Sequence, residues 1–321
     1  MTILITGANG QLGRCLQDKL HQLTASADRL SESDTLLLAE QLQGIPFVAL
    51  TSAQLDITDR DAVQSSFIEV KPRVVINAAA YTAVDRAEED QERAYAVNRD
   101  GVRNLAEACA QQNAALVHVS TDYVFPGDAN TPYTPEDATN ALGVYGESKL
   151  QGEIAAASQL ERLVILRTAW VYSEYGQNFV KTMLRLAASR DELSVVDDQI
   201  GSPTYAGNIA LATMAIAAKM IAGESCQGTS HCQGTYHYVD KDVMSWHAFA
   251  EAIFQRATSL GMIKKSMKVN AIPSSEYPTP TKRPSYSVLD ASSLIRDFAV
   301  NQVDCAASLE SVLRALSAES A

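Results

Sequence analysis

The sequence lacks a hydrophobic run long enough to cross a membrane, since none of its apolar stretches approaches the roughly 18–20 residues that a spanning helix requires. Its first residues, Met-Thr-Ile-Leu-Ile-Thr-Gly, also lack the basic segment with which a signal peptide begins. We therefore expect no membrane partner and a cytoplasmic location.

Positive charge is scarce as well. The chain has 26 Lys and Arg against 38 Asp and Glu, which gives a net charge of −12 at pH 7. This balance argues against general nucleic-acid binding, which depends on clustered cations. An anionic small ligand is not excluded, because it needs only a few local cations and a helix N-terminus.

Cysteine is sparse. The five cysteines are scattered and odd in number, which predicts reduced thiols in a cytoplasm. Cys226 and Cys232 lie on either side of His231, but no second ligand pair has metal-binding spacing. We therefore expect no zinc site.

The chain opens with a dinucleotide-binding pattern. Its 321 residues suffice for one large or two unequal domains, and residues 2–6 form the short apolar run of a buried parallel strand. The turn Gly7-Ala8-Asn9-Gly10-Gln11-Leu12-Gly13 follows, with leucines at helical spacing behind it. Strand, Gly-x-x-Gly-x-x-Gly turn and helix predict a cofactor diphosphate at a helix N-terminus, with a merely glycine-rich turn as the alternative.

The residues after the next strands bear on the cofactor. Strand 47–50 ends at the neutral Thr51 and Ser52, where an NAD-selective site usually carries an acidic residue. No arginine there demands a 2′-phosphate, so NADPH and NADH both remain open. Asp56 is placed to accept from the adenine amino group, and the small residues 78–80 let a cofactor lie against the backbone.

A Tyr-x-x-x-Lys spacing supplies the candidate chemistry. Tyr145 and Lys149 are four residues apart, on one face of a predicted helix. The ammonium is expected to lower the phenol's pKa and give an acid/base that works nearer neutral pH. Ser120 or Thr121, at the end of a predicted strand, is placed to hydrogen-bond a reacting oxygen. The alternatives are a surface helix pair and a merely polar strand end.

Three later features are less specific. Trp170 follows strand 162–167 and either stacks on a ligand or closes the core. Lys282 and Arg283, in a Pro-rich stretch, either bind a diphosphate or are solvated. The long link over 24–44 is interpreted as a partly helical surface elaboration.

Several stretches together resemble the extended short-chain dehydrogenases/reductases along nearly the whole chain. Besides the glycine turn they are Asn-Ala-Ala-Ala-Tyr-Thr-Ala-Val-Asp (77–85), Ser-Thr-Asp-Tyr-Val-Phe-Pro-Gly (120–127), Val-Tyr-Gly-Glu-Ser-Lys-Leu-Gln-Gly-Glu (144–153), Arg-Thr-Ala-Trp-Val-Tyr (167–172), Asn-Phe-Val-Lys-Thr-Met-Leu-Arg-Leu-Ala (178–187), Asp-Gln-Ile-Gly-Ser-Pro-Thr (198–204) and Arg-Pro (283–284). The details are similar to the branch of that family that reduces the 4-keto group of dTDP-4-dehydro-L-rhamnose to dTDP-L-rhamnose with NADPH or NADH.

The resemblance implies a role for each matching residue. Tyr145 donates a proton to the 4-keto oxygen, Lys149 binds the nicotinamide ribose and lowers the pKa of Tyr145, and Thr121 shares the hydrogen bonding. With Tyr145 and Lys149, the cofactor-binding residues are Gly7, Gly10, Gln11, Leu12, Gly13, Asp56, Ile57, Ala78, Ala79, Ala80, Tyr81 and Thr82. The residues that bind the dTDP-sugar are Val84, Thr121, Asp122, Tyr145, Trp170 and Arg283.

The predicted fold is α/β, a Rossmann-type doubly wound parallel sheet with a smaller C-terminal substrate-binding region. We expect residues 1–170 to form the NAD(P)-binding domain, with 205–240 returning to it, and 171–204 and 241–321 to form the substrate-binding region. Some members of the family dimerise through Mg²⁺ held by glutamates, one of them in the first helix. Cys15 stands at that place, so a metal-bridged dimer is not expected, while a homodimer remains open.

Two other functions remain alternatives. The catalytic pair is shared with nucleotide-sugar epimerases and with reductases of related 4-keto sugars. The family also includes a non-catalytic relative that binds and regulates methionine adenosyltransferase. The intact set of Thr121, Tyr145 and Lys149 favours a catalyst over a binding subunit.

Overall fold

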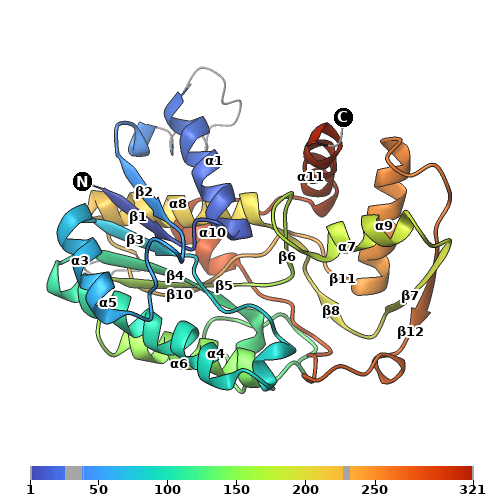
Figure 1. Cartoon of the computed structure of the whole chain (residues 1–321), viewed down its shortest axis with the longest axis horizontal. Coiled ribbons are helices and arrows are strands. Elements are labelled where there is room, and N and C mark those ends of the chain that lie inside the picture. The colour runs from blue at the N-terminus through green and yellow to red at the C-terminus, as the bar shows by residue number, and fades with distance from the viewer. Residues whose placement is uncertain (1, 26–37, 39, 227–231, 320–321) are drawn as a thin grey trace.

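A six-stranded parallel sheet forms the centre of the computed structural model, which describes residues 2–25, 38, 40–226 and 232–319 (Figure 1). The sheet order is β10-β5-β4-β3-β1-β2, and each neighbouring pair is parallel. The strands are β1 (Ile3–Thr6), β2 (Phe47–Leu50), β3 (Val74–Asn77), β4 (Ala115–Thr121), β5 (Leu163–Thr168) and β10 (Gly234–His237). The order reverses between β1 and β3, where such sheets bind ligands at the carboxyl ends of their strands.

Helices cover both faces of this sheet, as the predicted fold class requires (Figure 1). One face carries α1 (Gln11–Ala25), α8 (Ala206–Ala222) and α10 (Ser292–Phe298). The other carries α3 (Arg60–Val70), α5 (Val102–Gln111) and α6 (Val144–Ala157). Ile3 and Ile5 of β1 pack toward the first face and Leu4 toward the second. The α/β prediction is thus confirmed, because uniformly apolar strands are buried on both sides.

A second core lies beyond the sheet. It is built from α7 (Phe179–Ala187), α9 (Trp246–Ser259), α11 (Cys305–Glu319) and the parallel pair β7 (Glu192–Val196) and β12 (Lys268–Ile272). Two short pairs connect it to the rest, β6 (Val171–Tyr172) with β9 (Thr204–Tyr205) and β8 (Ile200–Gly201) with β11 (Met244–Ser245). The sequence did not predict β12 or α10, because both are short and β12 has no fully buried residue.

The segment that leads into α5 is irregular. A π-helical stretch, η3 (Ala96–Gly101), follows α4 (Gln91–Tyr95) and leads into α5. The short 3₁₀ helices are η2 (Arg86–Glu88), η4 (Asp122–Val124) and η5 (Ser274–Glu276). Since π-helical segments often occur at functional sites, η3 directs attention to the residues beside it.

Of the long link over 24–44, residues 26–37 and 39 lie outside the described residues. Leu38 and residues 40–42 are helical, and Leu38 and Leu42 are buried against α1. No helix in the part of the chain that the structure describes is long and apolar enough to cross a membrane.

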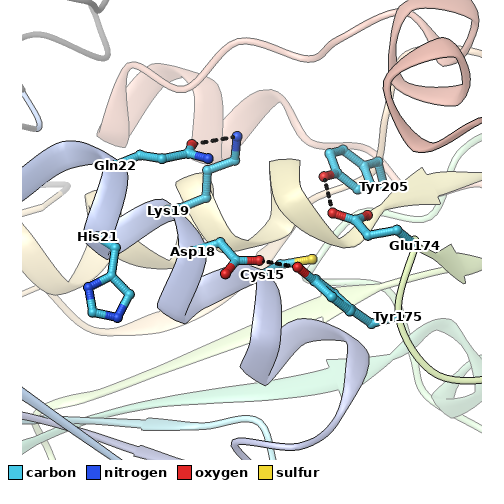
Figure 2. A pocket seen from close by; sticks show the side chains of 8 residues that line it. All are labelled: Cys15, Asp18, Lys19, His21, Gln22, Glu174, Tyr175 and Tyr205. Carbon is cyan, nitrogen blue, oxygen red and sulfur yellow. Dashed lines mark hydrogen bonds between the residues drawn. The ribbon is translucent and has the colours of Figure 1, made fainter. Parts of the chain in front are cut away.

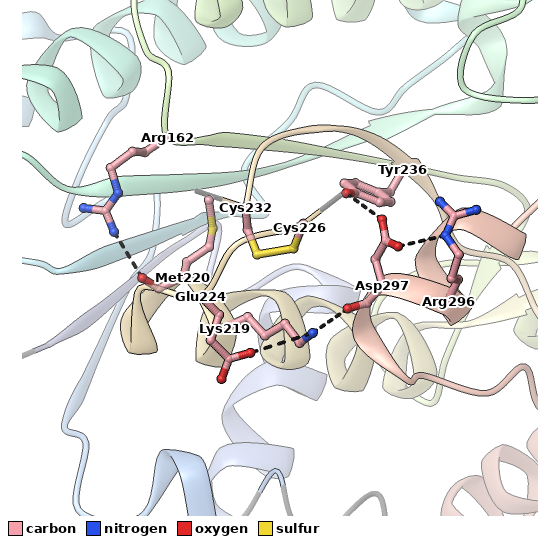
Figure 3. Close-up of a disulfide and its surroundings, with 9 residues drawn as sticks. All are labelled: Arg162, Lys219, Met220, Glu224, Cys226, Cys232, Tyr236, Arg296 and Asp297. Atoms are coloured by element: carbon pink, nitrogen blue, oxygen red, sulfur yellow. Dashed lines mark hydrogen bonds and ion pairs between the residues drawn. A yellow bond between two sulfur atoms is a disulfide. The ribbon is translucent and has the colours of Figure 1, made fainter. Parts of the chain in front are cut away.

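The cysteines differ from the prediction. Cys226, just after α8, and Cys232, just before β10, form a disulfide (Figure 3). Their Cα atoms are 4.7 Å apart, within the range that a disulfide spans. The expectation of reduced thiols is therefore wrong for this pair, because the fold brings two cysteines that are 6 residues apart in sequence to within bonding distance. Cys15, Cys109 and Cys305 are free and buried.

Candidate active site

The glycine turn after β1 leaves room for nothing larger than glycine at two positions. Gly7 has a φ of +72°, and a Cβ there would lie 2.6 Å from the backbone nitrogen of Ala79. A Cβ at Gly13 would lie 2.2 Å from the Gly7 carbonyl oxygen. The Gly10 N–H donates to that same oxygen at 3.0 Å, which closes the turn and starts α1. The first N–H groups of α1 are thereby presented at the sheet edge, a geometry suited to a phosphate.

A cavity of about 490 Å³ opens beside this turn, between the carboxyl ends of β1 and β3. Eight residues predicted to bind the cofactor line it: Gly7, Gly10, Asp56, Ile57, Ala78, Ala79, Ala80 and Tyr81. The predicted Gln11, Leu12, Gly13 and Thr82 lie beside it in sequence but are not part of its lining. The glycine turn and the three alanines 78–80 leave space for a dinucleotide to lie directly against the backbone.

Seven further lining residues were not among the predicted cofactor contacts, although Ser52 had been noted as a neutral strand-end residue: Asn9, Ser52, Leu55, Thr58, Arg93, Ala96 and Val97. Arg93, Ala96 and Val97 come from α4 and η3, which approach the cavity only through the fold. Asn98 of η3 ties this segment to α6, since its Nδ2 donates to the Tyr81 carbonyl and to Ser148 Oγ, at 3.1 and 3.0 Å. No sequence pattern identifies Arg93, Ala96 and Val97 as cavity residues, because their position depends on the π-helical stretch.

Tyr145 and Lys149 lie on one face at the start of α6, as predicted, and both are buried. The Tyr145 ring meets Tyr123 edge-on, with the ring centres 5.5 Å apart. Lys149 Nζ donates to the Val119 carbonyl of β4 at 2.6 Å. Burial lowers the pKa of Lys149 to about 8, and the charge of Glu153 opposes that shift.

The predicted lowering of the Tyr145 pKa is wrong for this structure. Burial raises the pKa of Tyr145, and a hydrogen bond with Thr121 opposes that rise only in part. The cost of burying a phenolate dominates, while the Lys149 ammonium is occupied by a backbone carbonyl. The Tyr145 hydroxyl therefore keeps its proton in this structure, in which no cofactor is bound.

Three residues that were predicted to bind the sugar, Val84, Thr121 and Asp122, lie close to this phenol. Val84, Tyr81 and Tyr123 pack in one apolar cluster with Tyr145. Thr121 Oγ1 accepts from the Tyr123 N–H at 3.2 Å and donates to the neighbouring Asp122 carboxylate at 3.0 Å. Burial raises the pKa of Asp122 to about 6.

Arg283 reaches the same cluster from the C-terminal region. Its guanidinium donates to the Tyr123 hydroxyl at 2.7 Å and pairs with Asp85 at 2.6 Å. Two residues earlier, Thr281 Oγ1 donates to the Val84 carbonyl at 3.1 Å. Of the two predicted roles for this loop, solvation is therefore wrong for Arg283, because the side chain is bound to the protein beside Tyr145.

Trp170 is held by packing. Its ring stacks on Trp246, with centres 3.5 Å apart and planes 7° apart. A Cβ at Gly201 would lie 2.4 Å from the indole, so the ring is closely covered there as well. Trp170 also has a φ of +46°, an unusual backbone conformation for a bulky residue. Trp170 is nevertheless only partly buried, so the packing on Trp246 and the predicted contact with a ligand are compatible.

A second cavity, of about 390 Å³, lies along α1 and is lined by Cys15, Asp18, Lys19, His21, Gln22, Glu174, Tyr175 and Tyr205 (Figure 2). Its polar side chains bond to one another: the Tyr175 hydroxyl donates to Asp18 at 2.5 Å and the Tyr205 hydroxyl to Glu174 at 3.2 Å. Burial raises the pKa of the Cys15 thiol, which disfavours a metal-binding thiolate. Among the described residues no group of three potential ligands is arranged to hold a metal ion.

Comparison with known proteins gives a consistent result. A family model described as the RmlD substrate binding domain matches residues 1–318. A dTDP-4-dehydrorhamnose reductase from Aggregatibacter actinomycetemcomitans is 43% identical over 310 residues, 97% of this chain and 97% of that protein. Solved dTDP-4-dehydrorhamnose reductases from Clostridium acetobutylicum (37% identity, TM-score 0.83, covering 99% and 100% of the two chains) and Bacillus anthracis (34%, 0.79, 99% and 99%) share the fold. The latter is a complex with NADP.

The parallel sheet, the glycine turn and the buried Tyr145–Lys149 pair define an extended short-chain dehydrogenase/reductase. Within that class, the matches over nearly its full length show that the chain belongs to the dTDP-4-dehydrorhamnose reductase family.

Proposed function

We propose that this protein reduces the 4-keto group of dTDP-4-dehydro-L-rhamnose to give dTDP-L-rhamnose, with NADPH or NADH as reductant. The observation that carries the proposal is the buried Tyr145 at the start of α6, which lies one helical turn from the buried Lys149 and edge-on to Tyr123. The names of the relatives support the substrate.

The residues around the first cavity fit a dinucleotide. The start of α1 and the turn from Gly7 to Gly13 would hold the diphosphate, Asp56 the adenine and Lys149 the nicotinamide ribose. When bound, the cofactor supplies a hydride to the carbonyl carbon. The neutral Ser52 in the cavity wall leaves both cofactors open, and the NADP complex of the Bacillus anthracis relative supports NADPH.

Tyr145 completes the reduction by donating its proton to the 4-keto oxygen as negative charge develops there. Thr121 hydrogen-bonds the same oxygen, and Lys149 stabilises the phenolate that Tyr145 becomes. A positioned acid and a nearby cation lower the barrier because they neutralise charge that exists only in the transition state.

For the rest of the substrate we propose contacts from Val84, Asp122, Trp170 and Arg283. Residues 1–170 and 205–240 act as the cofactor domain, and 171–204 and 241–321 as the substrate region. The parallel sheet and the separate core around α7, α9 and α11 support this division. We further propose a cytoplasmic location, where nucleotide sugars and reduced nicotinamides are made, and leave a homodimer as an open expectation.

The proposal is tested by incubating the purified chain with dTDP-4-dehydro-L-rhamnose and following the loss of NADPH or NADH absorbance in separate assays. Stoichiometric oxidation of either cofactor, with dTDP-L-rhamnose as the product, is expected. Folded protein that binds a cofactor but oxidises none in the presence of this sugar would contradict the assignment. In that case other 4-keto sugars, and binding to methionine adenosyltransferase, become the functions to test.

A further inference from the structure

A single cation lies in the wall of the first cavity. Among the described residues that line it, Arg93 alone is positively charged and Asp56 alone is negatively charged, and the others are small, apolar or uncharged polar residues. A nicotinamide dinucleotide carries a negatively charged diphosphate, and NADPH carries a 2′-phosphate as well. Arg93 is therefore the residue of this wall whose charge is opposite to that of the cofactor's phosphates.

Helical contacts hold the backbone of Arg93 beside the cavity. Ala96 and Val97, three and four residues later, also line the cavity, as expected for one side of a helix. The Ala96 N–H donates to the Arg93 carbonyl, so the helix continues at this point. Asn98 then fastens the segment to the chain that follows β3, because its side chain accepts from the Tyr81 N–H at 2.9 Å and donates to the Tyr81 carbonyl at 3.1 Å.

The Arg93 guanidinium has no hydrogen-bonding or ion-pair partner among the described residues, and the residue is exposed. Arg99, further along the same segment, differs in this respect, because its guanidinium binds the Asp100 carboxylate at 2.8 and 2.9 Å. The donors of Arg93 are thus available to a ligand in the cavity. A guanidinium suits a phosphate especially well, because two of its parallel N–H groups can bind two phosphate oxygens at once.

The charge of the rest of the chain makes a local cation more important. A net charge of −12 repels anionic ligands at a distance. The N-terminus of α1 offers N–H donors and only about half a positive charge. The end of β2 offers the neutral Thr51 and Ser52 where an arginine would bind a 2′-phosphate. Arg93 brings a full positive charge to the same cavity from a different segment, α4.

We propose that Arg93 binds a phosphate group of the cofactor, either the diphosphate or the 2′-phosphate of NADPH, and so contributes to cofactor affinity. This inference rests on the proposed reductase function for the identity of the ligand as a nicotinamide dinucleotide. A solvated surface arginine makes a different prediction, because its removal would leave cofactor affinity unchanged.

The test uses two substitutions of Arg93 and one control. Arg93→Met removes the charge and keeps an unbranched side chain of strong helix propensity. Arg93→Lys keeps the charge but loses the paired donors. The matched control is Arg86→Met, because Arg86 is likewise exposed and comes from the preceding helix η2, but does not line the cavity.

The first measurement is the dissociation constant of NADPH and of NADH in separate fluorescence titrations, without sugar and at low salt. Arg93→Met should weaken NADPH binding by about tenfold or more, as for the loss of a charge-assisted hydrogen bond. Arg93→Lys should give a smaller loss, and Arg86→Met should bind both cofactors like the parent. An equal loss for NADPH and NADH would assign Arg93 to the diphosphate, and a loss for NADPH alone would assign it to the 2′-phosphate.

The second measurement repeats the NADPH titration at increasing salt concentration. Binding by the parent should weaken more steeply with salt than binding by Arg93→Met, because salt screens the charge pair that the variant lacks. Thermal unfolding should be the same for both proteins, since Arg93 has no partner among the described residues.

Unchanged affinity for both cofactors in Arg93→Met, or an equal loss in Arg86→Met, would overturn the proposal, and so would the same salt dependence in parent and variant. The titrations need no turnover. A protein that binds dinucleotides but does not reduce the dTDP-sugar would therefore contradict the proposed function and still give a result for Arg93.

Discussion

The N-terminal and C-terminal parts of the site are built in different ways. Around the first cavity the walls are backbone and small side chains, with no space for a Cβ at Gly7 or Gly13. The C-terminal region instead reaches the site through side-chain pairs, such as Trp170 on Trp246 and Arg283 on Tyr123. A cavity wall made of backbone atoms has no space for an added side-chain atom. A wall made of paired side chains keeps its other contacts when one is lost, so substitutions there should reduce the activity only in part.

The largest effect on activity is expected at the Tyr145 hydroxyl, because neither the backbone nor the paired side chains around the site can replace the proton donor. Tyr145→Phe should lower kcat by about 100- to 10,000-fold, since it removes the proton donor, and should leave cofactor affinity intact. Stopped-flow turnover and a fluorescence titration with NADPH measure the two quantities. Tyr123→Phe makes the same chemical change in the neighbouring ring and should cost about tenfold or less. Equal losses in the two variants would remove Tyr145 from its proposed role.

Gly13→Ala tests the backbone-built wall. The added Cβ would lie 2.2 Å from the Gly7 carbonyl oxygen, and backbone cannot swing aside. Overpacking of this kind costs about 1–3 kcal/mol. If the whole cost falls on the cofactor-bound conformation of the turn, cofactor affinity should be roughly five- to 150-fold weaker.

Gly44→Ala is the matched control for this change. Gly44 also has a positive φ, of +72°, but a Cβ there would meet no atom within 4 Å. It should cost about 1 kcal/mol in unfolding free energy and nothing in cofactor affinity. Normal cofactor binding by Gly13→Ala would show that the turn is not a rigid cradle.

Arg283→Met tests the side-chain-built wall. It removes the bonds to Asp85 and Tyr123 but keeps most of the side-chain length. We expect the KM for the dTDP-sugar to rise about tenfold, as for the loss of one charge-assisted bond, with cofactor affinity unchanged. Lys282→Met, at the exposed neighbouring position, should change neither. A fall in cofactor affinity along with sugar affinity would contradict the assignment of the cofactor to the N-terminal region and of the sugar to the C-terminal region.

The smallest effect on activity is expected from the disulfide. It joins the end of α8 to the start of β10, at the sheet edge (Figure 3). Cys226→Ser should reduce the free energy of unfolding by roughly 2 kcal/mol, the value expected for so short a loop, and leave kcat unchanged. Treating the parent with a reductant should reproduce the loss in a denaturation experiment. Identical unfolding curves with and without reductant would contradict this account.

The backbone-built features are those that the sequence predicts well. Gly7 and Gly13 belong to a pattern in which each glycine has a steric reason, and the apolar run before them can only be a buried strand. Tyr145 and Lys149 share a helix face because of their spacing alone. These inferences concern local geometry, which is determined by residue types a few positions apart.

The missed features depend on contacts between distant segments. Arg93 and Val97 line the first cavity because α4 and η3 fold over it, and β12 exists only because β7 pairs with it. The direction of the Tyr145 pKa shift was also mispredicted, since spacing reveals the nearby cation but not the depth of burial. The disulfide was missed for a similar reason, because the number of cysteines does not show which two of them the fold brings together.

The central claim, that the chain is a reductase in which Tyr145 protonates the oxygen of a reduced carbonyl, is tested most directly by following the hydride. The parent protein is supplied with NADPH carrying deuterium at the transferable position and with dTDP-4-dehydro-L-rhamnose, and the product is analysed by NMR and mass spectrometry. We predict one deuterium at C4 of dTDP-L-rhamnose for each cofactor oxidised. A changed C4 configuration without net cofactor oxidation, or a product without deuterium, would contradict the claim.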